Sequence, residues 1–492
     1  MNNIILLPLL IPLLGAILQF CFLRGVRVQR WLNLATCSLL LVSAIVLIFL
    51  VLKQQYIVLQ VGGWRAPFGI TLIADILAAI MVLLTAIVGF CVAIYSFSDI
   101  GLRNVRVGFY PAYNVLLFGL CGAFLTGDLF NLYVWFEVVL ISSFILLVLS
   151  GGKFQLEAAV KYAVLNLIAT LLLLSAIAFL YGITGTLNMA DLALQVQDSH
   201  APGLITVVAV LFIVAFSMKG AAFPLFFWLP ASYHTTTYSS SAIFAGLLSK
   251  LGVYALIRVI TLIFLVNSPY LHFIIAVLAG LTLLTGIMGA ITHHQPRRVL
   301  SYSLISHIGF ILVGLAISTP MALLAAIFYL IQHVVVKTGL FLSAGLIHYY
   351  QKSGFRCLYF SKPIFSVMFF ILILSLSGIP PFSGFWPKLL LIESAIAAGQ
   401  ITLLVIMILV SLLTLYVMVR LWIQYFQVKQ TQASFVYQVV ERKSMLLSVA
   451  VLVGLALVIG LLPSLCYHLA KLTELQLLHP ENYVHAVLKR TV

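Results

Sequence analysis

Five ionisable side chains of this 492-residue chain stand in the middle of long apolar segments. Glu137 lies in LFNLYVWFEVVLISSF, and the other four are lysines that are each embedded among aliphatic and aromatic residues. A charge at the centre of a lipid bilayer costs at least about 2.5–3.5 kcal/mol. Such residues are kept where they pair with one another or line a wet path, and they often transfer protons. The four lysines are Lys219, Lys250, Lys337 and Lys388.

Two histidines and a second glutamate accompany this set. His333 precedes Lys337 by four residues, which places both on one face of a helix. His307 lies in SYSLISHIGF, and Glu393 follows Lys388 by five residues; we treat both as accessory candidates. A nearby carboxylate stabilises a charged lysine, whereas burial favours the neutral amine, so a changing distance can load and release a proton. The residues of the predicted proton relay are Glu137, Lys219, Lys250, His333, Lys337 and Lys388.

Structural ion pairs that hold helices together are the alternative interpretation. For a single Glu–Lys pair the two interpretations are equally good, because structural pairs also perturb pKa values. A set that spreads over at least five predicted helices favours the relay. Taken singly, His307 and His333 fit a hydrogen-bonded core histidine as well as they fit a relay member.

The composition indicates an all-α polytopic membrane protein. Hydrophobic residues make up 64% of the chain and charged residues 8%, whereas soluble domains carry about 25% charged residues. Apolar runs of twenty or more residues predict membrane helices, and the alternating strands of outer-membrane barrels are missing from the sequence. Only helices and closed barrels satisfy the backbone in lipid. The first apolar run, MNNIILLPLLIPLLGAILQF, lacks the basic start of a signal peptide, so we expect a retained membrane helix.

About fourteen membrane helices are predicted, and they are joined by short connections. We divide the chain into an N-terminal three-helix segment (1–107), a core (108–428), and a last helix with a polar tail (429–492). The tail itself is expected over 467–492. The predicted helices span residues 3–23, 31–52, 70–97, 108–126, 129–150, 158–181, 203–223, 238–260, 270–291, 300–318, 321–349, 363–397, 400–427 and 444–466.

Basic residues predict the orientation. Fifteen of the 26 lysines and arginines fall in loops on one side and five on the other, which places both termini on the outer side of an inner (plasma) membrane. The net charge of +15 therefore reports topology and gives no indication of nucleic-acid binding. Arg258 and Arg420 lie near predicted helix ends, and we expect them to reach lipid headgroups. Asp75 and Asp128, also near helix ends, are expected to cap helices or line the rim.

Two predicted helices are interrupted beside a relay lysine. Proline removes a backbone donor, and such breaks are tolerated in membranes where they are buried or line a cavity. Matched breaks in two halves are typical of inverted-repeat transporters. Lys219 and Lys388 are 169 positions apart, and the same offset carries Glu137 to the neighbour of His307. We predict two inverted five-helix repeats, roughly 108–260 and 270–428, with discontinuous helices seven and twelve. The residues of the breaks are Gly220, Pro224, Pro380, Pro381 and Gly384.

Motifs for metals, cofactors or redox chemistry are missing from the sequence. The six cysteines form no CxxC pair, and there is no dinucleotide-binding fingerprint. We therefore predict no metal site and no cofactor, and the predicted relay indicates a transporter in place of an enzyme.

Several segments together resemble the antiporter-like membrane subunits of Mrp-type multisubunit Na+/H+ antiporters and of respiratory complex I. They are DLFNLYVWFEVVLISSF, MKGAAFPLFFWLP, SAIFAGLLSKLGVYALIR, SYSLISHIGF, VVKTGLFLSAG and GIPPFSGFWPK. The resemblance spans nearly the whole chain, with its core over 110–420, and within the superfamily it points to the D subunit of the Mrp type. A lysine at 388 differs from one complex I homologue, which has glutamate there. Thr235, Thr236 and Thr237 depart from relatives, which usually place a proline after WLPASYH.

The resemblance implies a proton-translocating subunit of a Na+/H+ antiporter. It would act with other integral membrane subunits in the lipid bilayer, with H+ and Na+ as the transported ions. A complete sodium site is not visible, so we expect one at a subunit interface or built largely from backbone carbonyls. The alternative is a proton-pumping membrane subunit of an NADH:quinone oxidoreductase or a membrane-bound hydrogenase. The family's functional residues match Glu137 of helix five, Lys219 of helix seven, Lys250 of helix eight, His333 and Lys337 of helix eleven, and Lys388 of helix twelve.

Overall fold

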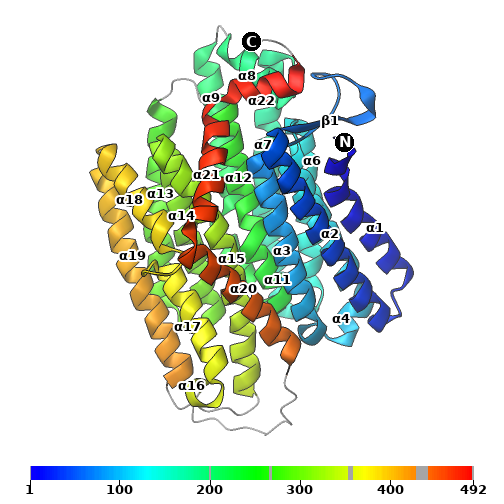
Figure 1. The fold of residues 1–492 in the computed structure, drawn as a ribbon, viewed down its shortest axis with the longest axis vertical. Coiled ribbons are helices and arrows are strands. Elements are labelled where there is room, and N and C mark those ends of the chain that lie inside the picture. The colour runs from blue at the N-terminus through cyan, green and yellow to red at the C-terminus, as the bar shows by residue number, and fades with distance from the viewer. Residues whose placement is uncertain (1, 199–200, 265–268, 353–357, 428–441, 490–492) are drawn as a thin grey trace.

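The computed structural model describes residues 2–198, 201–264, 269–352, 358–427 and 442–489. Over these residues the chain is a bundle of helices with one small two-stranded sheet at its upper end (Figure 1). Among the described residues, twelve helices are long and apolar enough to cross a membrane, and two shorter apolar helices span Phe109–Leu125 and Pro363–Ser377. Each of the fourteen predicted segments overlaps a helix, which confirms the all-α membrane fold. The number of crossings and the inverted repeat stay predictions.

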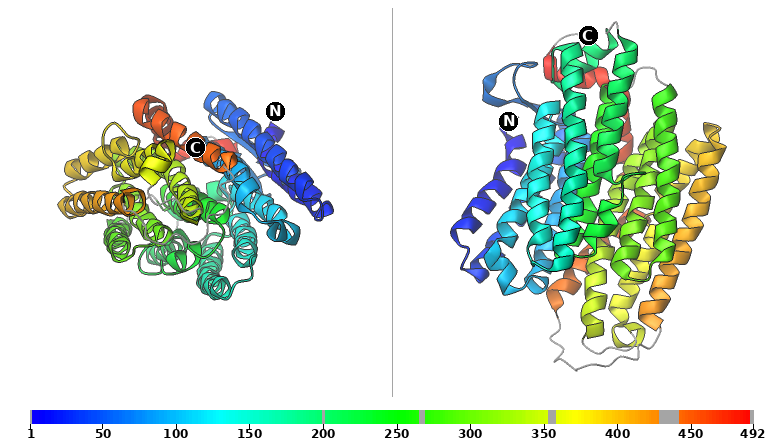
Figure 2. Two further views of the ribbon diagram at one scale, coloured as in Figure 1. Left: turned by 90° about the horizontal axis from the view of Figure 1, so that it is seen from below. Right: turned by 180° about the vertical axis from the view of Figure 1, so that it is seen from behind.

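The N-terminal part packs at one end of the bundle. Figure 2 shows its blue helices at one end of the cross-section and the yellow and orange α17 to α19 at the other. Strand β1 pairs antiparallel with β2, with Ile57 opposite Ala74. Its elements are η1 (Asn2–Leu6), α1 (Leu7–Cys21), α2 (Val26–Gln54), β1 (Ile57–Gln60), η2 (Val61–Gly63), β2 (Thr71–Ala74), α3 (Ile76–Asp99) and α4 (Leu102–Val107).

The middle of the chain provides the helices of the first predicted repeat. Helices α11 and α12 are joined without a break by the π-helical turn η3, and together they are wholly enclosed by the rest of the bundle. The elements are α5 (Phe109–Leu125), α6 (Leu129–Val148), α7 (Lys153–Thr184), α8 (Met189–Gln197), α9 (Pro202–Gly220), α10 (Trp228–Tyr233), α11 (Tyr238–Ile243), η3 (Phe244–Leu248) and α12 (Ser249–Leu262).

The remaining helices include α15, whose most apolar window is 94% buried. The long helices that the bundle encloses most fully thus include those that carry Lys250, His333 and Lys337. The elements are α13 (Pro269–Thr292), α14 (Pro296–Ile317), α15 (Pro320–Lys352), α16 (Leu358–Ser361), α17 (Pro363–Ser377), α18 (Phe385–Ala397), α19 (Ile401–Trp422), η4 (Ile423–Gln427), α20 (Lys443–Leu461), α21 (Pro463–Leu478) and α22 (Pro480–Leu488).

The polar tail predicted over 467–492 is helical as far as residue 488. After α20 crosses the bundle obliquely, α21 continues along α15 to the upper end, where α22 packs against α8 (Figure 1). Helix α21 buries Cys466, Ala470, Thr473 and Leu477, which recur every three or four positions and form one helix face. The segment has too many polar residues for a membrane run, yet they are spaced so that one face still packs.

Arg258 does not reach the headgroups, contrary to the prediction. Its side chain is buried and forms an ion pair of 2.6 Å with Asp75, which also caps α3 by accepting from Ala78 N. Arg420, which is half-buried, donates to the last carbonyls of α13, with 2.7 Å to Ile291 O, and its predicted reach to the headgroups stays a prediction. The expected capping roles of Asp75 and Asp128 are confirmed, since Asp128 Oδ1 accepts from Asn131 N at 2.8 Å.

We expect Arg258→Leu to destabilise the protein strongly. The change leaves the Asp75 carboxylate buried without its partner, and breaking a buried pair in this way costs about 3–5 kcal/mol. The midpoint of thermal unfolding of the purified protein should fall, and Asp75→Asn in the same chain should recover part of the loss. Lys161→Ala is the control, because its pair with Glu157 is exposed and such pairs contribute about 1 kcal/mol or less. Equal midpoints for both variants would contradict the role assigned to the buried pair.

Candidate functional site

The predicted relay residues lie on five helices, of which α6 and α9 meet through the rings of Phe136 and Phe216, whose centroids are 5.9 Å apart. Helix α9 packs against α12, η3 packs against α15, and α15 packs against α18. The lysines are 6% exposed or less, His333 is fully buried, and Glu137 on α6 is half-buried. Glu393 is exposed on α18, so the structure does not bring this accessory candidate into the cluster. The burial that the sequence predicted is confirmed for the four lysines and His333, whereas Glu137 is only half-buried, and the role of all six residues stays a prediction.

Glu137 and Lys219 lie within electrostatic reach of each other. The carboxylate is near enough to act electrostatically on the lysine, yet no direct ion pair joins the two in the described ranges. Lys219 Nζ lies over the Phe136 ring, 4.6 Å from its centroid, and the side chain lines a cavity with Tyr162 and Trp228. The cavity leaves about 20 Å³ for the centre of a water molecule, and about 10–15 Å³ is enough for one. One water can therefore sit beside this lysine.

The predicted break of helix seven places Lys219 at the end of α9. The helix ends at Gly220, and residues 221–227, which include Pro224, are not helical. A Cβ on Gly252 of α12 would lie 2.5 Å from Gly220 N, so only glycine lets the two helices approach this closely. This contact brings the end of α9 against the helix that carries Lys250.

Lys250 uses a local distortion of its own helix. Its Nζ donates to Ala245 O, which lies in the π-helical turn η3. A π-helical turn shifts the backbone bonds and is frequent at functional sites. This turn could not be foreseen from residue types, because Phe244–Leu248 has the composition of an ordinary apolar helix.

The two histidines form the centre of the cluster. The ring centroids of His307 and His333 are 5.5 Å apart, and His307 Nδ1 bonds to Tyr329 OH. Neither nitrogen of His333 has a hydrogen-bond partner in the described part of the chain. Lys250, Lys337 and Lys388 all act electrostatically on His333. His333 therefore has free sites to accept and donate a proton among three lysines.

Two polar neighbours of this cluster were missed by sequence reasoning. Tyr329 binds His307, and Ser303 Oγ accepts from Lys337 Nζ at 2.6 Å. Tyr329 stands four residues before His333, so the helical spacing that joined His333 to Lys337 could have found it too.

The predicted break of helix twelve lies just before Lys388, which stands in the first turn of α18. Helix α17 ends at Ser377 and α18 begins at Phe385, with Pro380, Pro381 and Gly384 in the segment between. Lys388 Nζ donates to Leu376 O at 3.2 Å and to Ser377 O at 2.8 Å. Gly378 has a φ of +82°, and a Cβ there would lie 2.7 Å from the lysine's Cδ. The lysine thus folds back over the end of the preceding helix.

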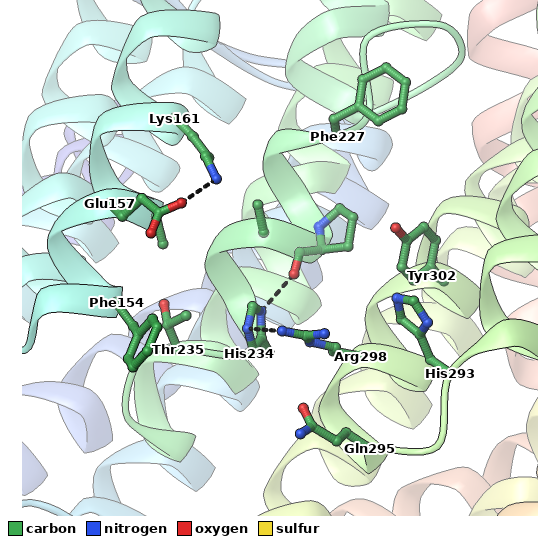
Figure 3. A pocket seen from close by; sticks show the side chains of 13 residues that line it. Phe154, Glu157, Lys161, Phe227, His234, Thr235, His293, Gln295, Arg298 and Tyr302 are labelled. Atoms are coloured by element: carbon green, nitrogen blue, oxygen red, sulfur yellow. Dashed lines mark hydrogen bonds and ion pairs between the residues drawn. The ribbon is translucent and has the colours of Figure 1, made fainter.

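A pocket of about 570 Å³ opens between α7, α10 and the start of α14. Figure 3 shows Glu157 and Lys161 on one side, His293, Arg298 and Tyr302 on the other, and His234 between them. His234 Nδ1 lies 2.7 Å from Pro230 O, and its Nε2 lies 3.3 Å from Arg298. This arrangement fits a neutral imidazole that donates to the carbonyl and accepts from the guanidinium. Thr235, from the segment that departs from relatives, also lines the pocket.

We expect His234 to make stability depend on pH. Burial lowers the pKa of His234 below its ordinary 6.5, opposed by the hydrogen bond to Pro230 and reinforced by Arg298. As the pH falls, the unfolded chain therefore binds this proton before the folded chain does. The contribution of His234 to the free energy of unfolding is fully present above pH 6.5 and declines below it. The unfolding midpoint should drop more between about pH 7.5 and 5.5 in the wild type than in His234→Gln. Identical drops in the two proteins would remove His234 as the cause.

Comparison with known proteins agrees with this geometry. Residues 126–414 match the family described as NADH:quinone oxidoreductase/Mrp antiporter, transmembrane. The D subunit of the Na+/H+ antiporter of Alkalihalophilus pseudofirmus is 41% identical and aligns over 99% of this chain and all of that one. A chain of the Mrp complex from Dietzia superposes with a TM-score of 0.91 at 28% identity, covering 99% of both chains. A chain of an archaeal membrane-bound sulfane sulfur reductase gives 0.89 at 26%, with the same coverage. The chain therefore belongs to the NADH:quinone oxidoreductase/Mrp antiporter transmembrane family, and its predicted likeness to the D subunit of Mrp-type antiporters is confirmed.

Proposed function

We propose that this chain is the proton-translocating subunit, of the D-subunit type, of a multisubunit Na+/H+ antiporter. It acts with other membrane subunits in the plasma membrane, with both termini on the outer side, and exchanges H+ for Na+. Residues 108–428 form the transporting core. One observation carries the proposal: five packed helices each hold buried or half-buried ionisable side chains, in series from Glu137 to Lys388. Full-length relatives that are named as D subunits of Na+/H+ antiporters support the choice of reaction.

The proposed relay begins at Glu137 and Lys219. A nearby carboxylate stabilises the ammonium form of a lysine, and an apolar surrounding favours the amine. Lys219 therefore holds its proton while it faces Glu137 and releases it when the two separate. The water-sized cavity beside Lys219 gives the proton a carrier. From there the proton reaches Lys250 across the contact between α9 and α12.

The second half of the proposed relay runs through His333. An imidazole accepts a proton at one ring nitrogen and releases another from the second, and both nitrogens of His333 are free of partners in the described residues. Lys337 and Lys388 lie within electrostatic reach of this ring. A proton that arrives from Lys250 can therefore leave toward Lys388.

Purified whole complex in proteoliposomes tests the function. We expect added Na+ to drive proton movement, read by a pH-sensitive dye, when no electron donor is present. A complex that moves protons only when it is given NADH, hydrogen or another reductant would support the alternative, a pumping subunit of a redox enzyme. The similarity to a sulfane sulfur reductase makes this alternative the one to exclude. Liposomes that lack the complex provide the baseline.

A further inference from the structure

The end of α17 presents two carbonyl oxygens that lack backbone donors. The last carbonyls of any helix need partners from outside the helix. If α17 continued, Leu376 O and Ser377 O would accept from residues 380 and 381, but both are prolines and have no N–H. Within the described ranges, the donor found for these two oxygens is Lys388 Nζ. The two prolines thus leave two adjacent carbonyl oxygens without a backbone donor, and a cationic side chain binds both.

The matching break in the first half of the chain is closed differently. Met218 O accepts from Ala221 N at 3.1 Å and from Trp228 Nε1 at 3.0 Å. Ser217 O accepts from Ala222 N at 2.8 Å. These donors are all neutral, and Lys219 lies on the helix itself. The last two carbonyls of α9, Lys219 O and Gly220 O, likewise have no donor in the described residues, so the second break differs in that an ammonium group binds its open pair.

Three further oxygens at this break are buried without a partner in the described residues. They belong to Gln332 on α15, Ser375 on α17 and Ser383 in the break, and all three side chains are 1% exposed or less. Gln332 Nε2 donates to Ser375 O at 3.3 Å, which ties α15 to the same last turn of α17. A buried polar atom without a partner costs about 1–3 kcal/mol, so three in one place call for an explanation.

We propose that these oxygens form the Na+ site of the antiporter, with Leu376 O and Ser377 O at its centre and Gln332 Oε1, Ser375 Oγ and Ser383 Oγ around them. The inference rests on the proposed function and names where its second ion binds. Hard cations take oxygen ligands, and the carboxyl end of a helix carries partial negative charge. The ends of broken helices serve as cation sites in transporters of this architecture.

The proposed site couples Na+ to the relay by exclusion. In this structure the Lys388 ammonium group donates hydrogen bonds to the two carbonyl oxygens, and Na+ carries the same single charge. Both cannot bind the same oxygens at once. Na+ binding therefore drives the head of Lys388 away from α17, and return of the lysine expels Na+. The last residue of the relay would in this way sense the transported cation directly.

Binding of radioactive Na+ to the purified whole complex tests the site. We expect Gln332→Leu to raise the Na+ dissociation constant about tenfold, the effect of losing one such contact, and the double variant Ser375→Ala with Ser383→Ala to raise it further, because it loses two. Ser366→Ala is the matched control on α17, since its Oγ already donates to Leu358 O and Lys362 O. The dissociation constant does not depend on the amount of complex, so reduced assembly would not hide the effect.

Lys388→Ala gives the opposite test. Removing the competing ammonium should tighten Na+ binding several-fold while exchange is lost, which misfolding would not produce. Unchanged affinity in the serine and glutamine variants, or weaker binding in Lys388→Ala, would overturn the site. The proposed function fails separately: normal exchange in Glu137→Gln rejects the relay, whereas lost exchange there with unchanged Na+ affinity in the site variants rejects only this inference.

Discussion

Glu137→Gln should abolish exchange by the whole complex, lowering its rate about 100- to 10,000-fold, the range for loss of a proton-transfer group. The amide keeps the shape of the side chain but carries neither the charge nor the proton. Lys219 then loses the carboxylate that acts on it electrostatically and cannot alternate between two proton affinities. Na+-driven pH change in vesicles that hold equal amounts of assembled complex measures the effect.

Glu157→Gln is the matched control for this prediction. It makes the same chemical change on α7, where the carboxylate pairs with Lys161 and both side chains are more than half exposed. We expect near-normal exchange, because an exposed pair of this kind contributes little. Glu137→Asp should retain part of the rate, since it restores the charge at a longer distance. Equal rates in Glu137→Gln and Glu157→Gln would remove Glu137 from the mechanism.

The fold could be predicted from the sequence because its strongest signals are local. Length and hydropathy of each apolar run predict a helix without knowledge of its neighbours. The C-terminal helix α21 was not predicted because its polar residues lower the mean hydropathy of the segment, although Cys466, Ala470 and Leu477 share one buried face. The ion pair between Arg258 and Asp75 was not predicted for another reason. Asp75 lies 183 positions earlier, and hydropathy does not tell which helices face each other.

The candidate site was predictable where burying a charge has a high cost. Lys219, Lys250 and Lys388 stood out because apolar segments exclude ammonium groups that have no special surroundings. What surrounds each amine was not predictable. Ala245 O is offered to Lys250 by a π-helical turn in ordinary apolar sequence, and the carbonyls that bind Lys388 come from the far side of a break. Such partners depend on backbone geometry that residue types alone do not encode.

His333→Leu should lower the rate of exchange about 100- to 10,000-fold as well. Leucine fills most of the space of the ring but cannot carry a proton between Lys250 and Lys388, which both act on His333. His348→Leu, on the same helix α15 but exposed, is the matched control and should keep the wild-type rate. The two variants are compared in the same vesicle assay, with the amount of assembled complex measured in each.

The same variant separates a relay histidine from a structural one. A core histidine that holds helices together needs hydrogen bonds, and the nitrogens of His333 make none within the described residues. Burying such atoms costs free energy, so leucine should leave the unfolding midpoint unchanged or raise it. Lost exchange together with retained stability therefore supports the relay. A fall in stability with exchange preserved would show that His333 packs the bundle and carries no proton. If His307 acts on the same path, His307→Leu should add no further loss in the His333→Leu background, because residues in one pathway are not additive.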